Sequence, residues 1–296
     1  MTKGPPAPGT PIPPGYHLVY FTPSDLESEL GPDGTDQTFT PPAPFSRRMW
    51  SGGLVRWNPE NPLRVGDLVT EETRLLGVTA KTDRKGNPML LARVGKLFHN
   101  EKGFAVEEER SWVFLETVHI PLRPITVQKN SELELSRVKD IKSTAGGPFP
   151  LRDLRWSAKA LFRFSALTFN AHMIHYNDPY TRYVEQRPGL VVHGPLNLIN
   201  MLDYWRDVHG QDGNIQPVEV TYRAIAPVHA TESYHIITAS TSSPASGAGN
   251  GPADQKSPMR EYGLVIAKGK GYEAPPFGQQ TIDVMSGNIR AVPSQV

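Results

Sequence analysis

Runs in which apolar and polar residues alternate dominate the first half of the chain. Three of them follow one another, at residues 68–79, 89–100 and 105–116. Short polar turns at residues 84–87 and 102–103 separate these runs, a pattern typical of strands joined in hairpins. This half therefore predicts an antiparallel meander. A short extended segment at residues 17–21 and a helical turn over residues 24–30 are expected before it.

The second half repeats this arrangement and adds a helix. Apolar residues recur at helical spacing from Leu196 to Trp205, Pro195 fits the first turn, and Gly210 fits the end. Ahead of this helix, apolar residues alternate within residues 156–167, as in a strand. Three strand-like runs follow the helix, at residues 218–226, 229–240 and 262–273. The pattern predicts an α+β fold in which a curved antiparallel sheet wraps a long helix.

The expected domain organisation follows from these patterns and from the Pro- and Gly-rich segments between them. Residues 241–258, rich in Ser, Gly, Ala and Pro, predict a flexible loop, and residues 145–148 predict a hinge-like break. The predicted division is a flexible arm (1–15), a first unit (16–125), a linker (126–155), a second unit (156–280) and a tail (281–296).

The amino-acid composition excludes several classes of partner and of site. The 296 residues carry 31 Lys and Arg against 30 Asp and Glu, a balance that argues against a nucleic-acid partner. The chain has no cysteine, which excludes a disulfide framework, a thiolate metal site and a Cys nucleophile. No apolar run approaches about 20 residues, so no membrane span is expected. The N-terminal residues match neither a secretory signal nor a transit peptide. A cytoplasmic location is expected, with a mitochondrial one left open.

Residues 165–180 gather an unusual number of polar groups just before the long helix. They include His172 and His175, with Asn170 five positions before the second histidine. Histidine can act as base and then as acid near neutral pH, and an asparagine amide can hold a water or a hydroxyl group. Addition or removal of water at an activated double bond is therefore one possible chemistry.

Other interpretations of this segment stay open from its spacing alone. A histidine pair in a polar loop can serve only as a hydrogen-bonding element, and His-x-x-His can suggest a metal site. No acidic residue lies between the two histidines and there is no HExxH helix, so no metal and no cofactor are expected. Tyr176 and Tyr180 fit packing better than acid catalysis.

A second element lies where the long helix begins. The apolar stretch 188–192 leads through His193 to Gly194 and Pro195. A backbone N–H at this position is supported by the helix dipole and can stabilise negative charge on a carbonyl oxygen. The alternative is an ordinary turn into a helix, with His193 holding the loop in place.

Together these elements resemble the MaoC-like hydratases, and more closely the group of hydroxyacyl-thioester dehydratase type 2 and mesaconyl-CoA hydratase. The matching segments are FSALTFNAHMIHY at residues 164–176, PGLVVHGPL at 188–196, and RRMWSGG at 47–53 followed by PLRVGD at 62–67. The resemblance implies a double hot-dog fold with two curved antiparallel sheets. It also implies a degenerate first unit, and a central helix best preserved in the second unit, which keeps the active site.

The resemblance also implies the roles of individual residues. The family's catalytic histidine corresponds to His175, its acidic partner to Asn170, and its oxyanion donor to the Gly194 N–H. The residues expected to contact the substrate are Ser165, His172, Tyr176, Val192 and His193. Two positions depart from the close group, because Met173 replaces its usual Arg and Asn177 its usual Asp. Asp178 is the expected substitute for the second of these.

The implied activity is that of a hydro-lyase acting on an α,β-unsaturated or β-hydroxy carbonyl, with an acyl thioester as the expected substrate. The two departures leave an alternative open: a dehydratase, isomerase or cyclase of specialised metabolism acting on a free small molecule. A third alternative is a protein that only binds an acyl ligand. The expected partners are a small molecule, possibly linked to CoA or to a carrier, and at most a second copy of the chain.

Overall fold

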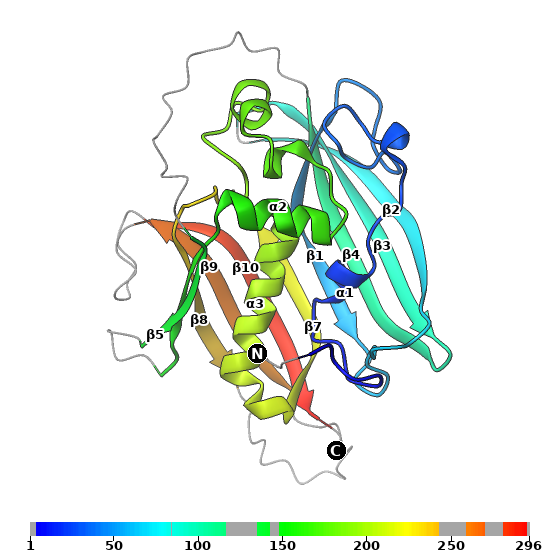
Figure 1. Cartoon of the computed structure of the whole chain (residues 1–296), viewed down its shortest axis with the longest axis vertical. Coiled ribbons are helices and arrows are strands. Elements are labelled where there is room, and N and C mark those ends of the chain that lie inside the picture. Colours follow the sequence, from blue (N-terminus) through cyan, green and yellow to red (C-terminus); the bar gives the residue numbers. More distant parts are fainter. Residues whose placement is uncertain are drawn as a thin grey trace.

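The computed structural model describes residues 4–83, 85–116, 135–142, 148–242, 259–269 and 281–294. Within these residues, ten strands form one antiparallel sheet in the order β2-β3-β4-β1-β7-β10-β9-β8-β6-β5 (Figure 1). The strands are β1 (Arg47–Trp57), β2 (Thr70–Thr82), β3 (Pro88–Asn100), β4 (Gly103–Leu115), β5 (Arg137–Ile141), β6 (Leu151–Arg155), β7 (Ile215–Ala224), β8 (Tyr234–Ser242), β9 (Arg260–Gly269) and β10 (Thr281–Pro293). The two curved sheets expected from the sequence therefore join edge to edge.

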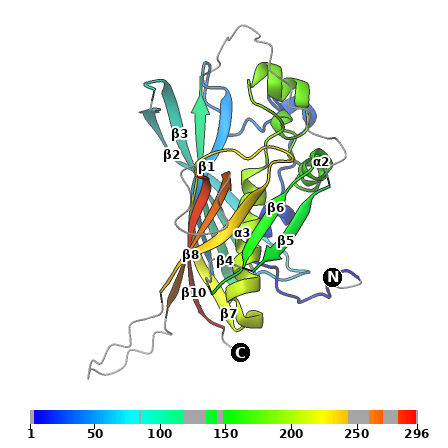
Figure 2. The ribbon, with the colours of Figure 1, turned by 90° about the vertical axis from the view of Figure 1, so that its left-hand side faces the viewer.

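The junction between the two halves is the pairing of β1 with β7. β1 pairs with β4 of its own half on one side and, through residues 52–56, with β7 of the second half on the other. The longer helices are α2 (Ala158–Leu167) and α3 (Gly194–His209), and the short ones are α1 (His17–Tyr20), η1 (Glu27–Glu29), η2 (Met173–His175), η3 (Tyr180–Val184) and η4 (Gln211–Gly213). The helices lie on one side of the sheet (Figure 2).

Helix α3 is the central helix of the second half and forms as predicted, from Gly194 to His209 with Gly210 as its C-cap. Leu198, Met201 and Trp205 are among its buried apolar residues, so the helix packs along the concave side of the sheet. It lies so close to β10 that a Cβ built on Gly287 would be 2.5 Å from the Met201 sulfur. Burial of this face stabilises the helix more than its intrinsic propensity does.

The first half has no counterpart to α3 among the described residues. Residues 17–21, expected as extended, form the single turn α1, and its His17 and Phe21 rings pack 5.5 and 5.2 Å from the ring of Phe98 on β3. A single helical turn in place of a long central helix is consistent with the degenerate first unit that the family resemblance implies. An apolar pentapeptide alone cannot distinguish a strand from a helical turn that is held by tertiary contacts.

Several boundaries expected from the sequence are wrong. Residues 156–167 contain α2 rather than a strand: the Ser157 hydroxyl caps it by accepting a bond from the Ala160 N–H, and Leu161 and Ser165, four positions apart, are both buried. The expected tail contains β10, which pairs with β7 and β9 and buries Ile289. Its residues interrupt the alternation with glycine and polar side chains, so the pattern is weak.

The linker and the arm also differ from expectation. The predicted linker contains β5 and β6, and Leu154 of β6 is fully buried. The N-terminal arm is held at its end by bonds from the Gly9 N–H to the Val65 carbonyl and from the Ile12 N–H to the Leu63 carbonyl, each 2.8 Å. Most of the predicted hinge at 145–148 and nearly all of the predicted loop at 241–258 lie outside the described residues. None of the helices described is long and apolar enough to cross a membrane.

Candidate active site

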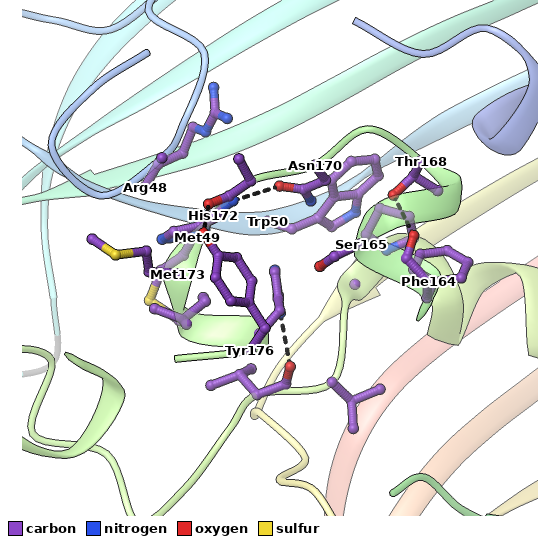
Figure 3. Close-up of a pocket in the computed structure, with 18 of the residues that line it drawn as sticks. Arg48, Met49, Trp50, Phe164, Ser165, Thr168, Asn170, His172, Met173 and Tyr176 are labelled. Atoms are coloured by element: carbon purple, nitrogen blue, oxygen red, sulfur yellow. Dashed lines mark hydrogen bonds between the residues drawn. The ribbon is translucent and has the colours of Figure 1, made fainter. Parts of the chain in front are cut away.

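A cavity of about 880 Å³ lies between the two halves, at the start of α3. Its second-half wall comes from α2, the segment after it and the residues leading into α3, and includes Ser165, Asn170, His172, His175, Tyr176, Val192 and Gly194. Its first-half wall includes Arg48, Met49 and Trp50 of β1 (Figure 3). Arg110 and Trp112 of β4 also belong to this wall. The volume is in the range of small-molecule and cofactor sites.

The orientation of the His175 ring is fixed by one backbone contact. Its Nδ1 lies 2.7 Å from the carbonyl oxygen of Val191. A carbonyl only accepts, so Nδ1 carries the proton, and Nε2 of the neutral ring keeps its lone pair. Val191 is itself held, because its N–H donates to the Ile174 carbonyl at 2.9 Å and the Val192 N–H donates to the Val228 carbonyl at 2.8 Å. The strand-like residues before α3 thus fix the position of the His175 ring.

Three histidines form a contiguous cluster, in which His172 and His175 line the cavity and His193 lies behind them. The rings of His175 and His193 stack with centroids 3.6 Å apart, and the His172 ring meets that of His175 edge-on at 5.5 Å. Burial lowers the pKa of His175 to about 4 and holds the pKa values of His172 and His193 well below their usual range. All three rings are therefore neutral at pH 7, and His175 is available as a base.

Asn170 follows directly after helix α2 ends. Phe169 has a φ of 50°, a left-handed conformation that turns the chain out of the helix. The Asn170 side-chain oxygen then accepts a bond from the His172 N–H at 3.0 Å (Figure 3). Because the oxygen is occupied, the amide NH₂ is the group left to interact with a ligand, and it has no partner among the described residues.

Gly194 begins α3 and packs against the first half. Its N–H lies in the first turn of the helix and has no acceptor within the part of the chain that the structure describes. The next residue is Pro195, which lacks an N–H. A Cβ at Gly194 would lie 2.9 Å from Cγ and 3.0 Å from Cβ of Trp50, closer than side chains pack. Glycine is therefore required here by close approach to the indole.

The other predicted contact residues have different placements. Ser165, His172, Tyr176 and Val192 line the cavity, and the Tyr176 hydroxyl donates to the Ala171 carbonyl at 3.0 Å. His193 is fully buried behind the wall and does not line it, and its Nε2 lies 2.9 Å from the Ser165 hydroxyl. This placement suits the interpretation of His193 as a residue that holds the loop, rather than one that touches the substrate.

The first-half loop at residues 31–37 was not expected to take part in the site. The Met173 N–H donates to the Asp33 carbonyl at 2.8 Å, and an Asp33 carboxylate oxygen lies 3.6 Å from Nε2 of His172. Gly34, with a φ of 82°, approaches so closely that a Cβ would be 1.9 Å from the Ala171 carbonyl oxygen. The Asp33–Gly34 turn was visible in the sequence, but nothing in its local pattern indicated that it packs against the histidine loop.

The two departures from the family pattern are accommodated within the loop. The Asn177 amide contacts the Met173 sulfur at 3.6 Å, and its side-chain oxygen accepts from the Tyr180 N–H. Asp178 does not replace the missing acid near the cavity, since it forms an ion pair with Arg182 at 2.6 Å. Among the described residues, no group of three acids or histidines is placed to hold a metal ion.

Comparison with known proteins supports a common architecture. The family model for hydroxyacyl-thioester dehydratase type 2 matches residues 15–230. A mesaconyl-C(4)-CoA hydratase from Chloroflexus aurantiacus is 37% identical over 206 residues, which are 69% of this chain and 68% of the relative. The mitochondrial hydroxyacyl-thioester dehydratase type 2 of Schizosaccharomyces pombe is 28% identical over 258 residues, 78% of this chain and 79% of the relative.

Solved structures show the same fold at low identity. A Mycobacterium tuberculosis protein described as a double hotdog fold matches with a TM-score of 0.53 and 14% identity, over 97% of this chain and 83% of that one. A putative MaoC domain dehydratase from Chloroflexus aurantiacus matches with a TM-score of 0.54 and 12% identity, over the same shares. The α+β double hot-dog prediction is confirmed. The named sequence relatives are hydratases and dehydratases, which are lyases, and the chain belongs to the hydroxyacyl-thioester dehydratase type 2 family.

Proposed function

We propose that this protein adds water to, or removes it from, an α,β-unsaturated or β-hydroxy acyl thioester, with His175 as the single acid–base group. The observation that carries the proposal is the bond from His175 Nδ1 to the Val191 carbonyl. That bond leaves Nε2 as a base in a wall shared with the free amide of Asn170 and the first N–H of α3. The names of both sequence relatives support a thioester substrate.

In dehydration, His175 Nε2 removes the proton on the carbon next to the thioester carbonyl. The Gly194 N–H, helped by the dipole of the 16-residue helix α3, stabilises the enolate oxygen. The protonated His175 then gives its proton to the departing β-hydroxyl, which the Asn170 amide holds, and water leaves. Hydration is the reverse, so the neutral imidazole is the active form in both directions.

The test is a spectrophotometric assay of crotonyl-CoA hydration with wild-type protein, two site variants and one control variant. We expect His175→Ala to lower kcat by about 10²- to 10⁴-fold, the usual contribution of a general acid–base group. Asn170→Ala should lower kcat to a smaller extent. His209→Ala is the matched control, because His209 is buried at the far end of α3 and does not line the cavity. Full activity in a folded His175→Ala protein would refute the assignment.

A free small molecule remains the alternative substrate class, motivated by Met173 and Asn177. If the substrate is a free small molecule, no acyl-CoA should be turned over. A free β-hydroxy carbonyl compound should then be turned over in the same cavity, again dependent on His175. A protein that only binds acyl ligands would show neither. For the working protein we propose a small-molecule partner, a monomer or homodimer, and a cytoplasmic location, although the fission yeast relative is named as mitochondrial.

A further inference from the structure

Asn197 lies on α3 one turn after Gly194, and both residues line the cavity. Asn197 is nevertheless only 4% exposed. Its N–H donates to the His193 carbonyl at 3.1 Å, which is the first bond of the helix ladder. The first turn of α3 is therefore regular, and residues three positions apart in it share one face of the helix.

The contacts of the Tyr234 hydroxyl fix the orientation of the Asn197 amide. Tyr234 lies on β8 and is fully buried, and its hydroxyl accepts from the Trp156 indole N–H at 2.7 Å, a group that only donates. The Asn200 amide nitrogen is a second donor to it at 3.5 Å. The one proton of the hydroxyl is donated to the Asn197 side-chain oxygen at 2.9 Å. The Asn197 oxygen therefore faces this hydroxyl, and its NH₂ points away from it.

The NH₂ of Asn197 has no acceptor in the part of the chain that the structure describes. Native proteins rarely leave a buried polar group unpaired, because the lost hydration is costly. The side that the hydroxyl of Tyr234 leaves free belongs to a residue that borders the cavity. A ligand in the cavity is therefore the partner that this amide lacks.

Helix geometry places this amide near the free N–H of Gly194. Side chains on an α-helix lean toward its N-terminus, so the Asn197 amide lies over the first turn. Positions three apart on one helix face are separated by about 5–6 Å. Two donors that share one acceptor, each about 2.9 Å from it, are at most about 6 Å apart. A single oxygen atom can therefore accept from both groups.

We propose that the Asn197 amide is a second oxyanion donor, which binds the thioester oxygen together with the Gly194 N–H. This inference rests on the proposed hydratase function. As His175 Nε2 takes the proton from the carbon next to the carbonyl, the electron pair of that bond moves onto the thioester oxygen, and both donors stabilise the charge. Tyr234 is a positioning residue, since its hydroxyl prevents the amide from rotating.

The first experiment measures crotonyl-CoA hydration by Asn197→Leu, which keeps the branched shape of the side chain and loses the donor. We expect kcat to fall by about 10²- to 10³-fold, the usual effect of removing one oxyanion donor. KM should change little, because the bond strengthens only as charge develops. Asn197→Ala removes the same donor without steric demand, and it replaces the leucine variant if that protein does not fold.

Asn200→Leu is the matched control. Asn200 contacts the same hydroxyl one turn further along α3, but it does not line the cavity, so its variant should keep a kcat close to that of the wild type. Tyr234→Phe should lower kcat less than Asn197→Leu does, because the donor remains but can rotate. Equal losses of kcat in the Asn197 and Asn200 variants would assign the effect to packing around Tyr234 and overturn the proposal.

A spectroscopic measurement tests the donor without turnover. Acetoacetyl-CoA is a thioester that ionises to an enolate with its own near-ultraviolet absorption band. We expect Asn197→Leu to weaken binding of this enolate by about 10- to 100-fold, the range for a hydrogen bond to a charged group. Binding of butyryl-CoA, which does not ionise, should change far less. Equal weakening of the two ligands would contradict a role in stabilising the oxyanion.

The two measurements separate this inference from the proposed function. If crotonyl-CoA is not hydrated while enolate binding depends on Asn197, the hydratase assignment fails and the donor site stands. If hydration depends on His175 while both Asn197 variants keep their kcat and their enolate binding, the hydratase stands and the second donor is wrong.

Discussion

The imidazole rings of His175 and His193 lie face to face, 3.6 Å between centroids and 17° between planes. Two rings at this separation cannot both be cationic in a buried site, because like charges would be in contact. His193 therefore affects the protonation of His175, in addition to packing against its ring. Its Nε2 lies 2.9 Å from the Ser165 hydroxyl, a hydrogen bond that helps to hold the ring in the stack.

The pH dependence of activity should reflect the lowered pKa of the buried His175. In the proposed mechanism the neutral form of His175 is the active one, and burial lowers the pKa of His175 to about 4. We therefore expect kcat/KM to be flat through neutral pH and to fall only as the pH approaches that value. A stopped-flow assay of crotonyl-CoA hydration across the acidic range measures it. An acidic limb near 6.5, the ordinary histidine pKa, would show that the ring is more hydrated than the geometry indicates.

Stability should also depend on these histidines. Their pKa values are lower in the folded state than in the unfolded chain, so the unfolded chain binds more protons, and the free energy of unfolding falls as the pH drops below about 6.5. For His175 alone the loss, complete below pH 4, is roughly 3 kcal/mol. Urea unfolding at a series of pH values tests this, and His175→Gln should reduce the slope. An unchanged slope in that variant would contradict the prediction.

The contact of Gly194 with Trp50 predicts a sensitive position. In Gly194→Ala the new methyl group would lie 2.9 Å from the indole, so the start of α3 or the indole must move. We expect kcat/KM to fall by about 10- to 100-fold, because small misplacements of an oxyanion donor are costly. Trp50→Ala in the same protein should restore part of the loss, since it removes the Cγ atom in the way. No recovery would mean that the glycine matters for another reason.

Gly34 makes a similar prediction for the loop from the first half. A Cβ there would be 1.9 Å from the Ala171 carbonyl, and the φ of 82° is itself strained for other residues. Gly34→Ala should lower both the unfolding free energy and the hydratase activity. Gly86→Ala is a matched control, with a φ of 85° and nothing within 4 Å. Equal effects of the two variants on stability and activity would show that the contact contributes nothing.

The local patterns predicted the elements that are both regular and continuous. The strands β2, β3 and β4 and the helix α3 each show their period over ten residues or more, so their positions were predicted to within a few residues. The segment 281–293 was missed because Ser286, Gly287 and Asn288 interrupt its alternation, even though it pairs on both sides in the middle of the sheet. Its strand conformation depends on neighbours that are distant in sequence.

The residues of the candidate site also divide into those that the sequence predicted and those that it did not. His175, Asn170 and Gly194 were found because they lie in two short segments with recognisable chemistry. Arg187 and Arg48 were not, since a single arginine carries no sign of whether an acid will lie beside it after folding. Tertiary contacts decide which group lies beside each arginine. Arg48 forms an ion pair with Asp36, whereas Arg187 contacts the sulfur of Met49.

The pairing of β1 with β7 brings two walls of different composition together around one cavity. The groups proposed to move protons belong to the second half, whereas β1 and β4 bring much of the opposite wall against them. Substitutions in that wall can therefore change which molecules fit the cavity and leave the groups proposed to transfer protons intact. Enzymes of this architecture could acquire new substrates through mutations in the half that carries none of the groups proposed to move protons.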